Sequence, residues 1–320
     1  MASQPGSALL ESQPTHIVVT DSFCSPALAL GLRAEYERKM GNPRETRPDR
    51  FVWDFWHVPG QYTQLRTPAQ DFFDSGKLYE EVESELLDWG RRELGVSALS
   101  PLWLSLYVAG CSQELHADVP HGPWAFVLSL SPKERRFSGG ETFILQPHVL
   151  DMWRGFQAGA VTEEQQLATR VAPEFNRLTV FDARFPHGVT RVDGTMDPMH
   201  GRLVLHGWFL EPTPFFEGAL SEEEATDALS MALEPLFAAL ADDDQAPLAN
   251  GVLVVRIHID AGGGITAIRA LSDTLRPHPG CGDIDEARAV LLSLVQQHLQ
   301  PARFPPAQGA SSITMPLVFE

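Results

Sequence analysis

Between residues 100 and 210, short apolar runs alternate with turns that are rich in glycine and proline. These runs contain many β-branched and aromatic side chains, which is typical of β-strands. The predicted strands are residues 102–108, 124–130, 141–145, 177–181 and 202–210. Several short strands with few helices between them predict a mainly β fold, either an antiparallel barrel or a jelly roll.

Helices are expected to flank this β-rich segment. Ser25-Pro26 has the pattern of an N-cap followed by proline in the first helical turn, which predicts a helix over residues 25–40. A second helix is predicted over residues 77–94, because its apolar residues recur at helical spacing and Gly95 follows its end.

The C-terminal part of the chain has a different pattern. Strands are predicted at residues 252–259 and 265–271, then a helix capped by Asp283 and a last strand at 311–319. This order predicts a small α+β unit. The chain is thus expected to divide into a flexible tail (1–15), a first domain (16–213), an acidic helical linker (214–248) and a C-terminal domain (249–320).

Composition and charge narrow the possible functions. The net charge is −18, and residues 217–244 carry nine acidic side chains and no Lys or Arg, which counts against nucleic-acid binding. Solubility explains this charge better than an acidic docking surface does. No apolar run approaches the roughly 20 residues that cross a membrane, and residues 1–15 lack a secretory signal pattern. Three widely spaced cysteines favour a reducing cytoplasm.

Candidate chemistry centres on His116-Ala117-Asp118 and on a distant His187. Alternation along a strand would place His116 and Asp118 on one face. Two imidazoles and one carboxylate suit Fe(II), and three protein ligands leave positions open for small molecules, so the site would be catalytic. Arg202 begins the next apolar run, where a cation suits a pocket for a dicarboxylate.

The same alternation predicts that residues 202, 204, 206 and 208 face the interior of the barrel. His206 and Trp208 would then line the cavity. For His206 a packed core histidine and a functional role are both open, whereas Trp208 has the pattern of an ordinary core residue. His121 and His200 lie in turn-like surroundings and are not assigned to a metal.

Over residues 100–210 the chain resembles the Fe(II)/2-oxoglutarate-dependent dioxygenase superfamily, and its prolyl-hydroxylase-like branch in particular. The motifs that carry this resemblance are Tyr107-x-x-Gly110, His116-x-Asp118, Phe137-Ser-Gly-Gly-Glu141, the run from Leu178 through Pro186-His187-Gly-Val, and the run from Arg202 to Phe209.

The resemblance implies a double-stranded β-helix in which His116, Asp118 and His187 bind iron. It implies that Arg202 pairs with the distal carboxylate of 2-oxoglutarate and that Tyr107 donates a hydrogen bond nearby. Dioxygen and 2-oxoglutarate would be consumed and succinate and CO2 released, with ascorbate a further candidate cofactor. The substrate would be a protein side chain, a peptidyl proline among the candidates, or a small molecule.

One departure leaves a choice between two arginines. The spacing from His187 to Arg202 is longer than in many relatives, because residues 193–201 form an inserted turn. Arg191 is therefore a rival for the carboxylate. Arg202 is preferred because it stands at the start of a strand with the expected alternation.

The C-terminal segment more weakly resembles the C-terminal domain of TonB-type proteins, through Gly251-Val-Leu-Val-Val and Arg303-Phe-Pro-Pro-Ala. It is interpreted either as a module for protein binding or self-association, or as a passive appendage. A rival function follows, in which a catalytically degenerate barrel serves as a protein-binding module. A zinc hydrolase with the same ligands is a more distant third.

Overall fold

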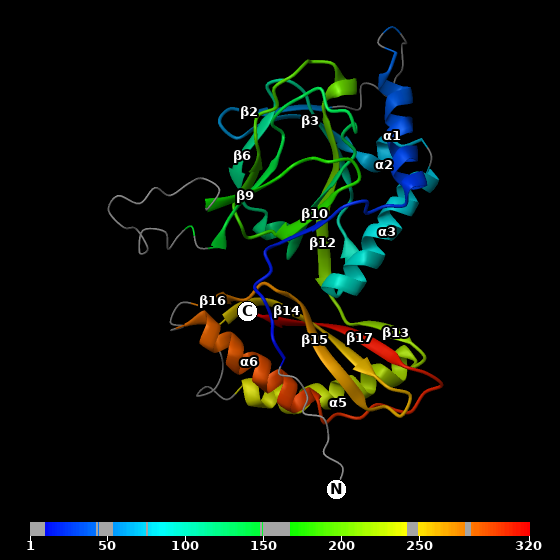
Figure 1. The fold of residues 1–320 in the computed structure, drawn as a ribbon, viewed down its shortest axis with the longest axis vertical. Helices are drawn as coiled ribbons and strands as arrows, with labels where there is room; N and C mark the ends of the chain where they lie inside the picture. The colour runs from blue at the N-terminus through cyan, green and yellow to red at the C-terminus, as the bar shows by residue number, and fades with distance from the viewer. Residues whose placement is uncertain are drawn as a thin grey trace, which may run out of the picture. The chain divides into compact units, whose positions relative to one another are not determined.

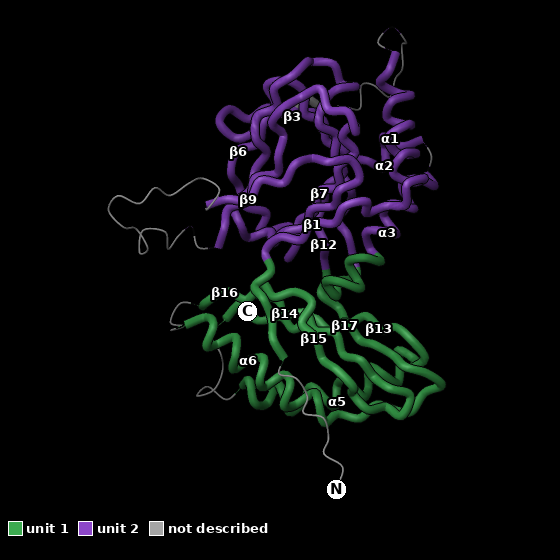
Figure 2. The backbone as a smooth tube through the Cα atoms, in the orientation of Figure 1, with its two compact units in different colours: residues 1–15, 88–97, 211–320 green, residues 16–87, 98–210 purple. Residues whose placement is uncertain are grey.

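The computed structural model describes residues 10–42, 44, 54–74, 76–147, 149, 167–241, 249–278 and 283–320. The chain forms two compact units, which Figure 2 colours separately. The jelly-roll unit comprises residues 16–87 and 98–210, and the terminal unit comprises residues 1–15, 88–97 and 211–320. No helix of the described residues is long and apolar enough to cross a membrane. Cys24 and Cys111 are buried and free, and Cys281 lies outside the described residues.

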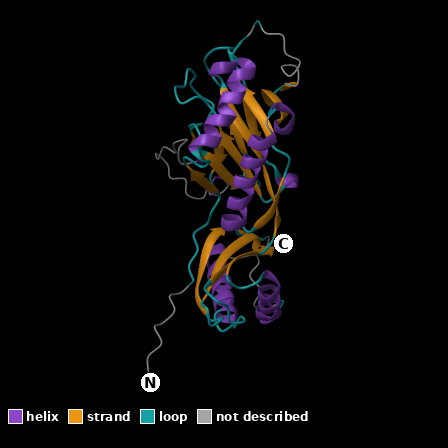
Figure 3. Cartoon of the chain, turned by 90° about the vertical axis from the view of Figure 1, so that its right-hand side faces the viewer, coloured by secondary structure: helices purple, strands orange, loops and turns teal. Residues whose placement is uncertain are grey.

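The jelly-roll unit is mainly β, with few helices (Figures 1 and 3). Its helices, including two short 3-10 turns, are α1 (Pro26–Met40), α2 (Ala69–Phe72), α3 (Gly76–Leu94), η2 (Val119–His121) and η4 (Pro198–His200). Its strands are β1 (Ile17–Thr20), β2 (Asp54–Val58), β3 (Tyr62–Pro68), β4 (Val96–Leu99), β5 (Trp103–Tyr107), β6 (Ser112–His116), β7 (Trp124–Ser129), β8 (Thr142–Leu145), β9 (Ala168–Val171), β10 (Leu178–Asp182), β11 (His187–Val189) and β12 (Arg202–Pro212). Helix α3 and strand β12 end in residues of the terminal unit, and strand β4 begins in them.

All twelve strands belong to one curled antiparallel sheet with the order β1-β10-β7-β12-β5-β3-β6-β11-β8-β9, in which β2 pairs with β3 and β4 with β12. Most neighbours in this sheet are not consecutive along the chain, which is the topology of a jelly roll and confirms the predicted fold class. Strand β12 shows how its two faces are used. Leu203 and Leu205 are fully buried on one face, while Val204 and His206 line a cavity on the other.

The predicted elements of this unit are largely present. Ser25 caps α1 and accepts a hydrogen bond from the backbone N–H of Leu28, as its sequence pattern predicts. The hairpin of β2 and β3 was not predicted. Its cavity-facing residues Gln64 and Arg66 are polar, so the hydrophobic alternation that identifies a strand is missing there.

The terminal unit contains β13 (Phe215–Gly218), α5 (Glu222–Leu240), β14 (Ala249–Ile259), β15 (Ile265–Asp273), β16 (Arg276–Pro277), α6 (Ile284–Leu299) and β17 (Ser311–Phe319). Its sheet has the order β13-β17-β14-β15, with β16 beside β14. Residues of α5 and α6 share one hydrophobic core with β14 and β17. The predicted β-β-α-β core is present, and Asp283 caps α6 by accepting from the backbone N–H of Asp285.

Two segments pack more closely than their composition suggests. The predicted acidic linker contains α5, whose Leu229, Leu233 and Leu236 are buried in the core of the terminal unit. The acidic residues of α5 are exposed, and three of them stand together in its first turn, so the helix is amphipathic. In the predicted tail, Leu10 is buried in the same core, and Ser12 donates a 2.6 Å hydrogen bond to Asp273. Residues 1–9 and 242–248 lie outside the described residues.

Asn176 yields a stability prediction. It is buried with a positive φ of 60°, and its side-chain amide bonds both the N–H and the C=O of Cys24, at 2.9 and 2.8 Å. Asn176→Ala would leave two buried backbone groups unpaired and keep the unfavourable φ, so we expect a loss of about 3 kcal/mol in the free energy of unfolding. Urea unfolding measures it. Ser22→Ala, at an exposed position with a similar φ, is the control and should change the free energy by less than about 0.5 kcal/mol.

Candidate active site

The cross-strand register places the sequence-predicted residues in two facing pairs. Strands β6 and β11 pair so that His116 stands opposite His187. Strands β5 and β12 pair so that Tyr107 stands opposite Arg202. Directly opposed residues on antiparallel strands point to the same side of the sheet, so each pair projects into the interior together. Asp118 follows the end of β6, where its backbone N–H donates to the carbonyl of Ala183 at 2.9 Å.

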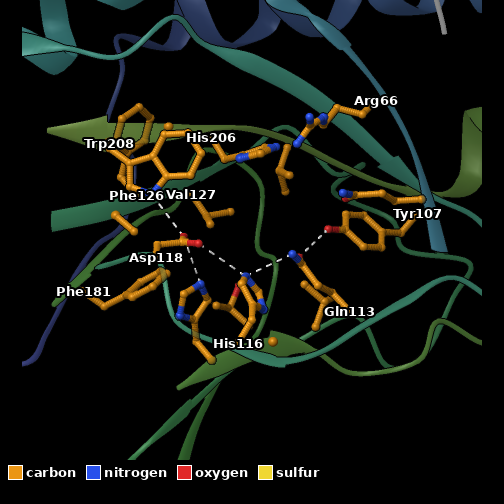
Figure 4. Close-up of a pocket in the computed structure, with 18 of the residues that line it drawn as sticks. Arg66, Tyr107, Gln113, His116, Asp118, Phe126, Val127, Phe181, His206 and Trp208 are labelled. Atoms are coloured by element: carbon orange, nitrogen blue, oxygen red, sulfur yellow. Dashed lines mark hydrogen bonds and ion pairs between the residues drawn. The ribbon is translucent and has the colours of Figure 1, made fainter. Parts of the chain in front are cut away.

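His116, Asp118 and His187 form a compact cluster, of which Figure 4 labels His116 and Asp118. One potential ligand atom from each lies within 4.8 Å of the other two. Asp118 Oδ2 is 3.3 Å from His187 Nε2, and Asp118 Oδ1 is 3.7 Å from His116 Nε2. The three candidate ligands predicted from the sequence are therefore brought together around one point.

The hydrogen bonds of both imidazoles fix which nitrogen faces this point. His187 Nδ1 lies 2.9 Å from the carbonyl of Phe185, and His116 Nδ1 lies 2.9 Å from the carbonyl of Glu114. A carbonyl only accepts, so each Nδ1 carries the proton and each Nε2 keeps its lone pair. Both Nε2 atoms point towards Asp118, which is the tautomer that a metal ligand requires.

The charges within the cluster are consistent with this assignment. Burial lowers the pKa of His116, and the adjacent His187 lowers it further, so the neutral imidazole is favoured. Burial opposes the ionisation of Asp118, but its interactions with His187 and His116 and a hydrogen bond from the Trp208 indole outweigh that effect. The pKa of Asp118 therefore lies below its ordinary value, and the carboxylate form is favoured.

The cluster lies in the wall of a cavity of about 160 Å³, which also holds Arg202 and Tyr107. Arg202 is only 1% exposed, and its guanidinium carbon lies 4.7 Å from the centre of the Tyr107 ring. Its Nη2 donates to Thr142 Oγ1 at 3.2 Å, while its Nε has no hydrogen-bond partner among the described residues. A buried cation with unused donors is a site for an anion.

The rival arginine lies elsewhere. The Arg191 side chain is 70% exposed, is 3.7 Å from Asp193 and does not line the cavity. His200 is also outside the cavity lining and lies 3.4 Å from Asp197. The structure thus places Arg202, and not Arg191, where an anion inside the cavity could reach it.

His206 and Trp208 line the cavity, as the alternation along β12 predicts. His206 Nε2 lies 2.8 Å from Ser105 Oγ. Burial lowers the pKa of His206 to about 3, helped by the nearby Arg66 and Arg202, so its ring is neutral at neutral pH. Trp208 is more than a packed core residue, because its indole N–H donates to Asp118 Oδ2 at 3.1 Å.

Several cavity residues were not anticipated from the sequence. Tyr107 donates to Gln113 Oε1 at 3.1 Å, and Gln113 Nε2 lies 3.1 Å from His116 Nε2, so a single amide connects the two facing pairs. Burial raises the pKa of Tyr107 to about 12, which keeps the phenol protonated as a donor. Arg66 is held between the rings of Trp56 and Trp103, at 3.8 and 4.0 Å. The sequence did offer one signal for Gln113, because it is a polar residue only three positions before His116.

Comparisons with known proteins found a matching family model and similar solved structures. Residues 102–210, about a third of the chain, match the family model described as 2OG-Fe(II) oxygenase superfamily. A prolyl-4-hydroxylase from Pseudomonas putida is 17% identical, with a TM-score of 0.42 over 61% of this chain and 92% of that chain. A prolyl hydroxylase from Trichoplax adhaerens, in complex with a hypoxia inducible factor peptide fragment, is 12% identical, with a TM-score of 0.46 over 61% of this chain and 84% of that chain.

No curated protein sequence matches the chain. The family match begins before Tyr107 and ends after Trp208, so it spans the candidate metal ligands and the buried arginine alike. Over residues 102–210, the chain is thus similar to the 2OG-Fe(II) oxygenase superfamily.

Proposed function

We propose that this chain is an Fe(II)- and 2-oxoglutarate-dependent dioxygenase that hydroxylates a protein side chain or a small molecule, with release of succinate and CO2. One observation carries the proposal. Two imidazole Nε2 atoms converge on Asp118 inside a cavity that also contains the buried Arg202. A site for a metal and a site for an anion thus share one small space.

The donor set fits Fe(II). His116, Asp118 and His187 would hold the ion through two neutral nitrogens and one carboxylate oxygen, and three protein ligands leave positions open. Iron bound there supplies the activation of dioxygen that couples decarboxylation of 2-oxoglutarate to oxidation of the substrate. The Nδ1 hydrogen bonds of both histidines hold the rings in place before the ion arrives.

The other end of the cavity fits the distal carboxylate of 2-oxoglutarate. Arg202 would form a charge-assisted pair with it, and a planar guanidinium can bind a carboxylate through two parallel hydrogen bonds. The protonated Tyr107 and the Thr142 hydroxyl lie beside the guanidinium and can donate to the same group. Because Arg202 is buried, water competes little for this interaction.

The substrate and the setting complete the proposal. The prolyl-hydroxylase-like motifs make a peptidyl proline the first substrate to test, with ascorbate as a candidate cofactor. A cytoplasmic location, the predicted domain boundaries, and a protein partner or self-association through the C-terminal segment are further proposals from the sequence.

The metal ligands give the first test. His116→Ala or Asp118→Ala removes one of three donors, so we expect iron-dependent succinate formation to fall below detection. The visible charge-transfer band of the anaerobic chain with Fe(II) and 2-oxoglutarate should disappear as well. His200→Ala removes a histidine that also has an aspartate neighbour but lies outside the cavity lining, and it should leave both signals intact. Unaltered turnover in the Asp118 variant would contradict the ligand assignment, and no band in the unaltered chain would favour a binding module.

The arginines give the second test. Arg202→Gln removes the buried cation, so the KM for 2-oxoglutarate should rise about 100-fold, because losing one partner of a buried charge pair costs about 3 kcal/mol. Steady-state kinetics with varied 2-oxoglutarate measures the change. Arg191→Gln is the matched control and should leave the KM unaltered, since its side chain is exposed. A larger effect at Arg191 would transfer the anchoring role to it.

A further inference from the structure

The indole of Trp208 contacts the carboxylate that links the two histidines. Its Nε1 donates to Asp118 Oδ2 at 3.1 Å, as the dashed line in Figure 4 marks. The same oxygen is 3.3 Å from His187 Nε2, and the other carboxylate oxygen is 3.7 Å from His116 Nε2. One indole N–H therefore acts on the group on which both imidazoles converge.

The position of the indole is itself fixed. The His121 ring lies 4.5 Å from Trp208, centroid to centroid, with 31° between the two planes. His121 ends the 3-10 turn that directly follows Asp118, so a single turn supplies both the hydrogen-bond acceptor and a stacking ring. On the backbone side, the N–H of Trp208 donates to Ser100 Oγ at 3.0 Å, and its carbonyl accepts from the N–H of Ser100 at 2.9 Å.

Close packing at Gly122 holds this arrangement in place. Gly122 has a φ of 149°, and a side chain there would meet the carbonyl of Phe209 at 2.7 Å and Trp208 Cβ at 3.4 Å. Strand β12 and the turn after Asp118 can approach closely only because this residue has no Cβ. The indole and the carboxylate are thus positioned by two segments about 90 residues apart in sequence.

Asp118 needs such a partner. It lies beyond the end of β6, so the sheet does not hold its side chain in the way it holds His116 and His187. Rotation about the Cα–Cβ bond would carry the carboxylate away from the imidazoles, and a directed hydrogen bond opposes that rotation. Groups that hydrogen-bond to metal ligands orient them, and losing such a group typically costs 10- to 100-fold in metal affinity or activity.

We propose that Trp208 is a positioning residue of the metal site, whose indole N–H holds the Asp118 carboxylate in the orientation that completes the ligand set. The inference rests on the proposed function, because it takes Asp118 as a ligand. Trp208 acts through Asp118 and so is distinct from the three ligands themselves. Because Trp208 and Arg202 both lie on β12, this strand would then contribute both to the anion site and to the metal site.

Metal affinity provides the test, with Co(II) as the probe and the full chain freed of metal beforehand. Trp208→Phe keeps an aromatic ring and removes the N–H, so calorimetry should give an affinity for Co(II) about 10-fold weaker. The visible absorption of bound Co(II) should change in shape, because the carboxylate is no longer held in one orientation. Trp103→Phe also removes one indole N–H, but from a residue outside the cavity lining, and it should bind Co(II) like the unaltered chain.

Folding is followed by thermal unfolding without metal, where Trp208→Phe and Trp103→Phe should behave alike. If Trp208→Phe unfolds at a much lower temperature, the inference is tested instead by NMR. The signals followed are those of the indole N–H groups of the seven tryptophans in the 15N-labelled chain. The signal of Trp208, assigned through its contacts with the His121 ring, should move when Asp118→Ala removes the acceptor.

Three results would overturn the inference. Co(II) affinity of a folded Trp208→Phe within about twofold of the unaltered chain, with the same absorption spectrum, would show that the hydrogen bond does not matter for the metal. An indole N–H signal of Trp208 that stays at the same position in Asp118→Ala would also overturn the inference. Failure of the unaltered chain to bind Co(II) would remove the proposed function together with this inference, which distinguishes the two failures.

Discussion

Strand β11 pairs with β6 so that His187 stands opposite His116, and β12 pairs with β5 so that Arg202 stands opposite Tyr107. Everything else in the candidate centre depends on these two registers. A slip of one residue in either pair would turn a whole strand over and send its cavity-facing side chains to the other face of the sheet. The register between β11 and β6 shifts immediately after His187, so the pairing that matters is confined to the end of both strands, next to Asp118.

The cavity formed by these registers is lined by one carboxylate, Asp118, and by two guanidinium groups, Arg66 and Arg202. His116 and His206 are favoured in their neutral forms, and Tyr107 stays protonated. Asp118 and Arg202 remain charged at opposite ends of a space of about 160 Å³. Burying such groups costs stability unless they are paired, so a cation bound near Asp118 and an anion bound near Arg202 would each relieve part of that cost. Buried charged groups that lower stability are common at binding sites, because they are needed there for function.

Several features could be predicted because they depend on local chemistry. Ser25 and Asp283 cap helices in the structure as their sequence patterns indicate, because capping needs only neighbouring backbone groups. The apolar strands of the jelly-roll unit were found because their hydrophobicity is continuous. Strand β3 was missed because Gln64 and Arg66 face the cavity. The helical character of α5 was predicted, but its burial in the core was not, because burial depends on which elements pack against it.

The sequence by itself determined the types of side chain at the site and the faces of the strands that carry them, because alternation along a strand is a local property. Spacing left Arg191 as a rival of Arg202, and only the tertiary structure showed that Arg202 is buried while the Arg191 side chain is exposed, because burial inside the cavity depends on which strands pair. The tertiary structure also decided the tautomers of the two histidines, the link through Gln113 and the hydrogen bond from Trp208 to Asp118. The contact between Trp208 and Asp118 joins segments about 90 residues apart, whereas the tautomers and the link through Gln113 depend on how side chains are turned inside the cavity, and no local pattern records either.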